Sequence, residues 1–127
     1  MKNKIISLNS KKISFLLFKK GANFRGLDTI KNHKIKSNFL TRGNGDLSLT
    51  EKELIFKEWI PKRSFTISIK NISKVEMAPL SYLTGRIFPM LKIYYQDETG
   101  SHIFKIAIGF KKETQVWLEA LNGLKHS

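Results

Sequence analysis

The sequence has 127 residues, which is enough for one domain and too short for two ordinary ones. Hydrophobic residues make up 41% of the chain and nine residues are Phe, so the composition is that of a protein with its own core. A net charge of +13 favours a polyanionic partner, whether nucleic acid, anionic lipid or an acidic protein. The absence of cysteine excludes a disulfide framework, a thiolate zinc site, an iron–sulfur cluster and a cysteine nucleophile, and it fits a reducing compartment.

The N-terminal third of the chain carries most of the excess charge, because residues 1–42 hold eleven basic residues and one acidic residue. A lysine-rich genomic composition explains this charge as well as a binding role does. Residues 4–20 carry apolar side chains with partly helical spacing, which predicts a basic amphipathic helix that either packs on the core or lies on an anionic membrane. Residues 21–33 contain two glycines and several polar residues and are predicted as a loop. The expected organisation is therefore a basic segment over 1–33 and one domain over 34–127.

No transmembrane segment is predicted. The longest uninterrupted apolar run, residues 15–18, has four residues, and a helix needs about twenty to span a bilayer. The first six residues resemble the start of a signal peptide, but polar residues 9–12 interrupt it before an apolar stretch of about 7 residues has formed. These features predict a cytoplasmic protein.

Short segments of alternating polarity follow, separated by turn residues, and they predict seven strands. The predicted strands cover residues 35–41, 46–50, 53–59, 64–69, 72–78, 90–95 and 102–108. A tight turn is predicted at Gly43-Asn44-Gly45 and a second hairpin turn at residues 96–100, whereas residues 79–89 form a longer connection between prolines. In residues 111–124, Trp117 and Leu121 lie four residues apart on one face, which predicts a C-terminal amphipathic helix.

Successive short connections favour antiparallel neighbours. A sheet of seven strands with one apolar face must curl to bury that face, and the C-terminal helix has the right size to close the open end. The predicted fold class is therefore mainly β (all-β or α+β), a partly open barrel of about seven antiparallel strands capped by one helix.

Three stretches carry a resemblance to a known family. The run from Gly45 to Phe56 follows the pattern G-x-L-x-L-T-x-x-x-L-x-F, residues 67–75 read I-x-I-x-x-I-x-x-V, and residues 116–121 match a closing helix. In this order they resemble bacterial pleckstrin-homology-like (PH-like) and GRAM-type domains over residues 34–124. The resemblance implies a PH-like barrel whose members bind phosphoinositides, other anionic lipids or peptides, so the ligand has to be argued from the site.

The resemblance also implies where a ligand would bind. In lipid-binding members, basic side chains of the first strands and their loop hold the headgroup phosphates. The matching positions and the neighbouring basic residues are Lys34, Lys36, Arg42, Lys57, Lys62 and Arg63. We predict that these six residues form a basic rim at one end of the barrel that binds anionic lipid.

No catalytic or cofactor-binding constellation is predicted. The three histidines have no partner at metal-ligand spacing, and no nucleophile-elbow, phosphate-loop or dinucleotide motif is present. We therefore expect a non-enzymatic binding or scaffolding module that needs no cofactor. The alternative is a protein-interaction or self-associating domain that uses exposed strand edges, with Trp59, Tyr82 and Phe88 as anchors. Nucleic acid is a less favoured partner, because few aromatic residues lie among the N-terminal lysines.

Overall fold

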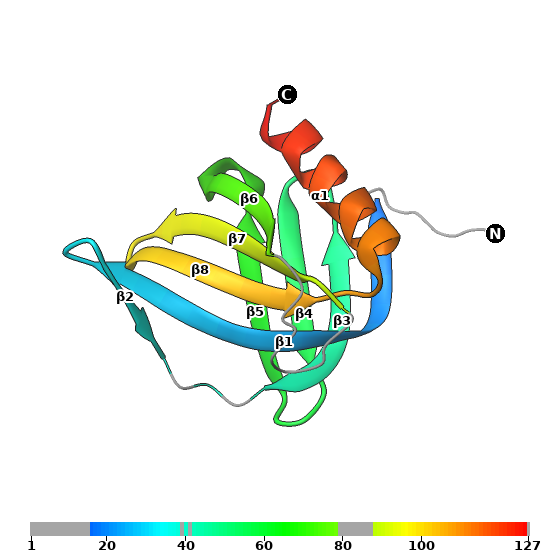
Figure 1. Ribbon diagram of the computed structural model, residues 1–127, viewed down its shortest axis with the longest axis horizontal. Helices are drawn as coiled ribbons and strands as arrows, with labels where there is room; N and C mark the ends of the chain where they lie inside the picture. Colours follow the sequence, from blue (N-terminus) through cyan, green and yellow to red (C-terminus); the bar gives the residue numbers. More distant parts are fainter. Residues whose placement is uncertain (1–15, 39, 41, 79–87, 127) are drawn as a thin grey trace, which may run out of the picture.

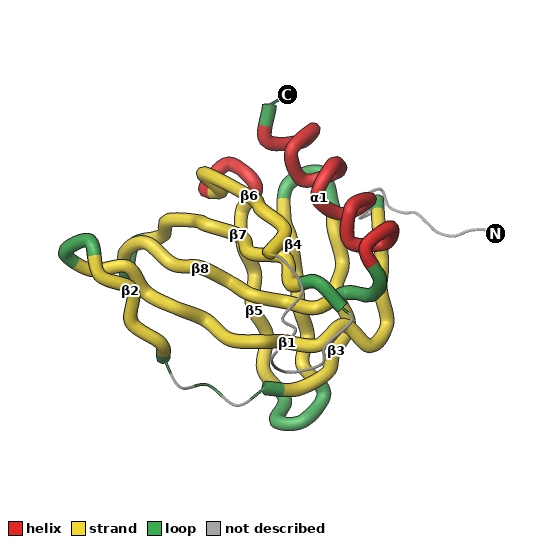
Figure 2. Tube along the Cα trace, in the orientation of Figure 1, coloured by secondary structure: helices red, strands yellow, loops and turns green. Residues whose placement is uncertain are grey.

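Eight antiparallel strands and one C-terminal α-helix form the described part of the chain, which comprises residues 16–38, 40, 42–78 and 88–126 of a computed structural model (Figures 1 and 2). The strands are β1 (Leu17–Lys31), β2 (Lys34–Ser37), β3 (Gly43–Leu49), β4 (Glu53–Glu58), β5 (Arg63–Ser68), β6 (Ile72–Ala78), β7 (Met90–Asp97) and β8 (Gly100–Ala107). A 3-10 turn, η1 (Ile69–Asn71), precedes β6, and the helix is α1 (Lys111–Lys125).

The strands form one sheet in the order β5-β4-β3-β1-β8-β7-β6, and β2 pairs with the far end of β1. The long strand β1 makes this arrangement possible, because its first half pairs with β3 and its second half with β8. Its register shifts at two bulges, next to Gly21 and Gly26, where φ is +90° and +136°. Such angles suit glycine, and a bulge bends the strand, so the sheet folds back over its own apolar face.

The predicted loop over residues 21–33 is wrong, because these residues continue β1 as far as Lys31. The two glycines mark bulges within a strand and do not end it. Residues 17–31 are therefore part of the sheet. Of the predicted helix over 4–20, residues 17–20 are strand, and residues 1–15 lie outside the described residues.

The tight turn predicted at residues 43–45 is also wrong, because all three residues belong to β3. The first hairpin turns at Asn32 and His33, whose φ values are +52° and +65°. Two consecutive residues with positive φ are typical of the primed turns that join antiparallel strands. The strand expected over 35–41 is observed as β2 over Lys34–Ser37, with residues 39 and 41 outside the described part.

The other predicted elements are confirmed, with ends that differ by at most three residues: six strands as β3 to β8, the hairpin turn between β7 and β8, and the C-terminal helix as α1. Ile69, predicted to end a strand, instead begins η1. Most of the connection predicted over 79–89 lies outside the described residues.

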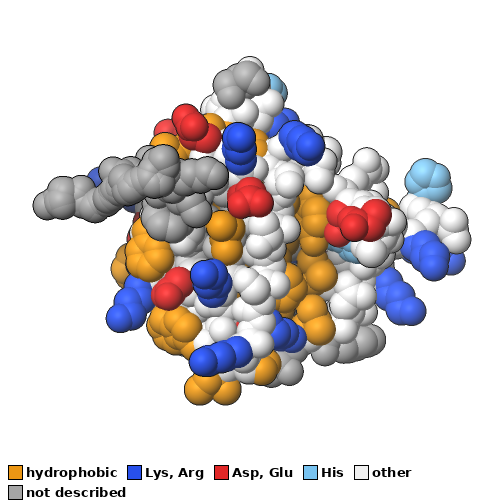
Figure 3. Space-filling view, turned by 180° about the vertical axis from the view of Figure 1, so that it is seen from behind, with side chains coloured by type: hydrophobic (Ala, Val, Ile, Leu, Met, Phe, Trp, Pro, Cys, Tyr) orange, Lys and Arg blue, Asp and Glu red, His pale blue; other side chains and the backbone are white. Residues whose placement is uncertain are grey.

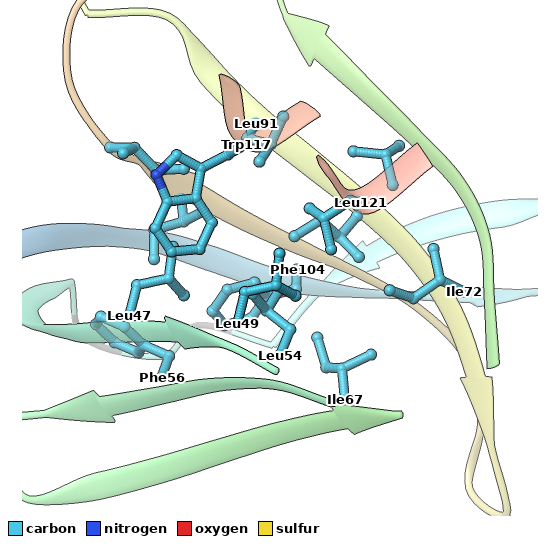
Figure 4. Close-up of a cluster of buried hydrophobic side chains, with 14 of the residues drawn as sticks. Leu47, Leu49, Leu54, Phe56, Ile67, Ile72, Leu91, Phe104, Trp117 and Leu121 are labelled. Carbon is cyan, nitrogen blue, oxygen red and sulfur yellow. The ribbon is translucent and has the colours of Figure 1, made fainter. Parts of the chain in front are cut away.

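The core lies between the two halves of the bent sheet and beneath α1. Its apolar side chains come from β1, from β3 to β8, from η1 and from α1. Most of the strands contribute alternate residues, as expected for strands with one buried face. Figure 4 shows Trp117 and Leu121 of α1 reaching toward Leu47 and Leu49 of β3. The helix therefore closes one end of the barrel, where it packs against β6 and η1.

Gly45 is required by packing. A Cβ atom at this buried position would collide with the backbone carbonyl of Lys57 and with the Cα of Glu58 on the neighbouring strand. Backbone atoms cannot yield as side chains can, so we expect Gly45→Ala to lower the free energy of unfolding by about 2–3 kcal/mol, measured by urea denaturation.

Gly123→Ala is the control for this substitution. A Cβ there meets nothing within 4 Å, and the position is helical, so we expect a gain of up to about 1 kcal/mol. Equal stability of the Gly45→Ala variant and the unchanged protein would contradict the close approach of β3 and β4.

Candidate functional site

The structure distributes the six predicted site residues over two places. Lys34 and Lys36 lie on β2, at the end of the β1–β2 hairpin, whereas the other four lie around the turn that joins β4 to β5. Five of the six residues are exposed, and Arg63 is half-buried. In Figure 1 the hairpin projects at the left and the β4–β5 turn at the bottom.

The hairpin carries three lysines on one face. Lys34 lies opposite Lys31 of β1, and Lys36 lies opposite Thr29. Opposite residues of an antiparallel pair point to the same side, as do residues two apart on a strand. Lys31, Lys34 and Lys36 therefore share one face, which we call the hairpin face. The turn adds the exposed imidazole of His33 nearby.

The lysines of the hairpin face form no ion pair with the described residues around them. No ion pair among residues 16–38, 40, 42–78 and 88–126 involves Lys31, Lys34 or Lys36. Like charges directly opposite each other on paired strands repel and destabilise the pair. An anion bound to the hairpin face would therefore reduce the repulsion between Lys31 and Lys34.

The second basic group surrounds the β4–β5 turn. Arg42 leads into β3 beside this turn: a Cβ on the adjacent Gly43 would lie 3.1 Å from the carbonyl oxygen of Ile60. Lys62 is exposed in the turn itself. Lys57 is exposed on β4, opposite Asp46 of β3.

Arg63 has a structural role at the base of the same turn. Its guanidinium forms an ion pair with Glu58, with both Nε and one terminal nitrogen 2.6 Å from Oε1. It also lies over the rings of Phe24 and Phe65, 5.5 and 5.8 Å from their centroids. The Glu58 side chain is 0% exposed and that of Arg63 25%. Arg63 therefore neutralises a buried carboxylate and is less available to an external ligand than the other five residues.

The two groups are too far apart to hold one small headgroup together. Gly43 pairs with Phe24 of β1, and Lys36 pairs with Thr29. Five residues of strand correspond to about 17 Å. The six predicted residues therefore form two separate basic groups and not one compact site.

Figure 3 shows the face opposite to that of Figure 1. Blue basic side chains project at its right border, where the hairpin lies, and basic and apolar side chains lie side by side at its lower border, at the β4–β5 turn. Over the rest of this face, basic and acidic side chains are interspersed. Basic side chains therefore stand out at the two projecting ends of this face.

Sequence reasoning missed Lys31, because it had assigned that residue to a loop. Once the turn is placed at Asn32 and His33, the alternation of lysines at 34 and 36 identifies Lys31 as the third member of the face. The pairing of Glu58 with Arg63 was also missed. Glu58 ends β4 and Arg63 begins β5, and four residues join them. A correct register for this hairpin would have placed the two side chains opposite each other and so indicated the ion pair.

A further polar cluster lies at the β7–β8 hairpin. The Nε2 of His102 lies 3.0 Å from Asp97 Oδ1 and 2.7 Å from Thr99 Oγ1, and its Nδ1 lies 3.1 Å from Thr29 Oγ1. Hydrogen bonds from Thr99 and from His102 hold the pKa of Asp97 below its usual range. Burial raises the pKa of the neighbouring Tyr95 to about 12. His102 contacts Asp97 and Thr99 within the β7–β8 hairpin, and its contact with Thr29 joins this hairpin to β1. We therefore interpret the cluster as structural.

Two further observations concern chemistry that the site could support. Among the described residues, no three of His, Asp and Glu are grouped so that they could hold a metal ion. No helix in the same part of the chain is long and apolar enough to cross a membrane.

Comparison with solved structures identifies the architecture. The chain superposes on the N-terminal PH domain of Vps36 with a TM-score of 0.60 and 16% sequence identity, over 94% of this chain and 83% of that domain. The fold is PH-like. This confirms the predicted mainly β barrel with a C-terminal helix, and β1 and β3 to β8 are its seven consecutively paired strands. No family model and no curated protein matches the sequence.

Proposed function

We propose that this chain is a non-enzymatic binding module that associates with anionic membrane lipid. The contact surface comprises the hairpin face together with Arg42, Lys57 and Lys62 around the β4–β5 turn. Such a module would be a cytoplasmic protein held peripherally at the membrane by charge.

The lysines of the hairpin face, which form no ion pair with the described residues, carry this proposal. Lys31 and Lys34 lie directly opposite each other, an arrangement that costs stability without a partner. Each basic side chain near an anionic bilayer contributes about 1 kcal/mol, so the six residues together would support reversible association. The separation of about 17 Å between the two groups favours a surface over a single small anion.

Charge reversal on the hairpin tests the proposal. The double substitution Lys34→Glu with Lys36→Glu is expected to weaken binding to phosphatidylserine-containing vesicles roughly thirtyfold or more, because two contributions of about 1 kcal/mol are lost. Binding of the unchanged protein should decline as salt is raised. Co-sedimentation with the vesicles at low and high salt measures both effects.

The control reverses two exposed lysines far from the hairpin, Lys70 on η1 and Lys112 on α1. Lys70→Glu with Lys112→Glu changes the net charge by the same amount and should retain most of the binding. Equal loss in the two double variants would show that only net charge matters, and failure of the unchanged protein to sediment at about 50 mM salt would remove the lipid function.

A protein-interaction function is the second candidate. The strands β5 and β6 end the order of paired strands in the described sheet, so each has an edge open to a further strand. Ser64 and Thr66 are exposed on β5, and no charged residue interrupts the strand between Arg63 and its end. Size-exclusion chromatography with light scattering would reveal self-association, and a monomer at high concentration would count against it.

A further inference from the structure

The β4–β5 turn exposes apolar side chains at its tip. Ile60 is 84% exposed, more than any other large apolar side chain in the described part of the chain. The neighbouring Trp59 is 40% exposed, and Pro61 is exposed as well. We call Trp59, Ile60 and Pro61 the apolar tip. An isolated exposed apolar residue is common on protein surfaces, but consecutive ones at the end of a projecting turn call for an explanation.

The apolar tip is held in place from beneath. The backbone N–H of Trp59 donates a hydrogen bond to the carbonyl of Asn44, at 2.9 Å, and the edge of its indole lies against Gly21. At the base of the turn, the buried carboxylate of Glu58 is paired with Arg63. The exposure of Ile60 is therefore built into the fold, because the residues on both sides of the tip are anchored.

Basic side chains surround the apolar tip. Lys62 follows it directly, Arg42 lies beside it, and Lys57 points outward two residues before it. Figure 3 shows orange apolar and blue basic side chains side by side at this lower border. The order is thus apolar at the end of the turn and cationic around its base.

We infer that the apolar tip inserts into an anionic bilayer, a statement that rests on the proposed lipid-binding function and deepens it. Ile60 enters the acyl region, and Trp59 occupies the interface between headgroups and acyl chains that Trp prefers. Arg42, Lys57 and Lys62 then lie at the level of the headgroup phosphates. The apolar residues at the end of the turn and the basic residues at its base thus correspond to the acyl region and the headgroup region of the bilayer.

The shape and charge of the tip favour a bilayer over a protein partner. A projecting turn needs a yielding or concave partner, and a fluid bilayer accepts it without a preformed pocket. The surrounding positive charge complements an anionic lipid surface. The hairpin face adds a second cationic contact on the same chain, as an extended surface would require.

Ile60→Ser tests insertion in the whole chain of 127 residues. Loss of a buried Ile side chain from the membrane is expected to weaken binding to phosphatidylcholine–phosphatidylserine vesicles at least about tenfold, measured by co-sedimentation. The control is Val116→Ser, an exposed apolar residue on α1 at the opposite end of the molecule, which should leave binding unchanged (Figure 1). Circular dichroism verifies that both variants are folded.

Depth-dependent quenching provides a second measurement. The chain has two Trp residues, and Trp117 on the buried face of α1 is only 3% exposed, so lipids brominated in the acyl chain should quench Trp59 selectively. Trp59→Phe should abolish this quenching. Glycerophosphoserine, the headgroup without acyl chains, should leave the emission of Trp59 unchanged.

The outcomes separate the two proposals. Vesicle binding that survives Ile60→Ser, without quenching by brominated lipid, would overturn insertion and leave charge-driven binding intact. No vesicle binding at all would overturn both. Loss of self-association in Ile60→Ser, measured by light scattering, together with unchanged vesicle binding would show that the tip contacts a protein and would overturn insertion.

Discussion

Arg63→Met is expected to lower the free energy of unfolding by about 3 kcal/mol, because it leaves the Glu58 carboxylate buried without its partner. The two side chains are paired at 2.6 Å, and the Glu58 side chain is fully buried. Loss of one member of a buried pair costs about 3–5 kcal/mol, and we expect the lower end because Arg63 itself is partly exposed. Urea denaturation followed by circular dichroism gives the value.

A double substitution separates the buried charge from lost packing. Glu58→Met with Arg63→Met removes both charges and keeps two long side chains, so it should be more stable than Arg63→Met alone. Arg63→Lys keeps the charge and loses the planar group that lies over Phe24 and Phe65, so an intermediate loss is expected. If the double variant were no more stable than Arg63→Met, lost packing and not the orphaned carboxylate would be the cause.

The same ion pair links stability to the proposed membrane contact. Glu58 and Arg63 are the last and first residues of β4 and β5, so their pairing fixes the turn that carries Ile60. A variant that breaks the pair and still folds should hold the apolar tip less firmly. Stability and vesicle binding should therefore be measured on the same variants.

The sequence predicted the parts of the fold whose patterns are local. Phe65 and Ile67 alternate with polar residues, and both pack on the core as expected. Trp117 and Leu121 lie four residues apart and are buried on one face of α1. In each case a regular element with one buried face leaves its period in the sequence.

The strand β1 was missed because its period is interrupted. Two bulges shift the side chains that face the core, so no single alternation runs through its 15 residues. Gly21 and Gly26 also resemble loop residues when only composition is considered. Gly45 misled in a similar way: it was interpreted as a turn residue, whereas the close approach of β4 requires it.

The candidate site was predicted only in part, for the same physical reason. Charge is visible in sequence, and Lys34, Lys36 and Arg42 could be identified from it. Whether a charge is free depends on what lies across the strand: Lys34 faces another lysine, whereas Arg63 faces a carboxylate. That distinction is a matter of register, which short polar segments such as β2 do not specify.

Trp117→Ala is expected to lower the free energy of unfolding by about 4 kcal/mol, because it empties the largest side-chain volume that α1 contributes to the core. The indole reaches from the helix toward Leu47 of β3, so its loss leaves a cavity between helix and sheet (Figure 4). A domain of this size has a total stability of about 5–15 kcal/mol, so the variant would keep only part of it. The loss of stability should be measured by circular dichroism during urea denaturation. Tryptophan fluorescence is less suitable, because the substitution removes one of the two Trp residues.

Val116→Ala is the matched control, one residue away on the same helix. Val116 is 51% exposed, and Ala is the better helix former, so we expect a change within about 0.5 kcal/mol. Equal effects of the two substitutions would show that α1 does not close the barrel. A large loss confined to Trp117→Ala would establish that the buried face of α1 supplies the core at this end of the barrel.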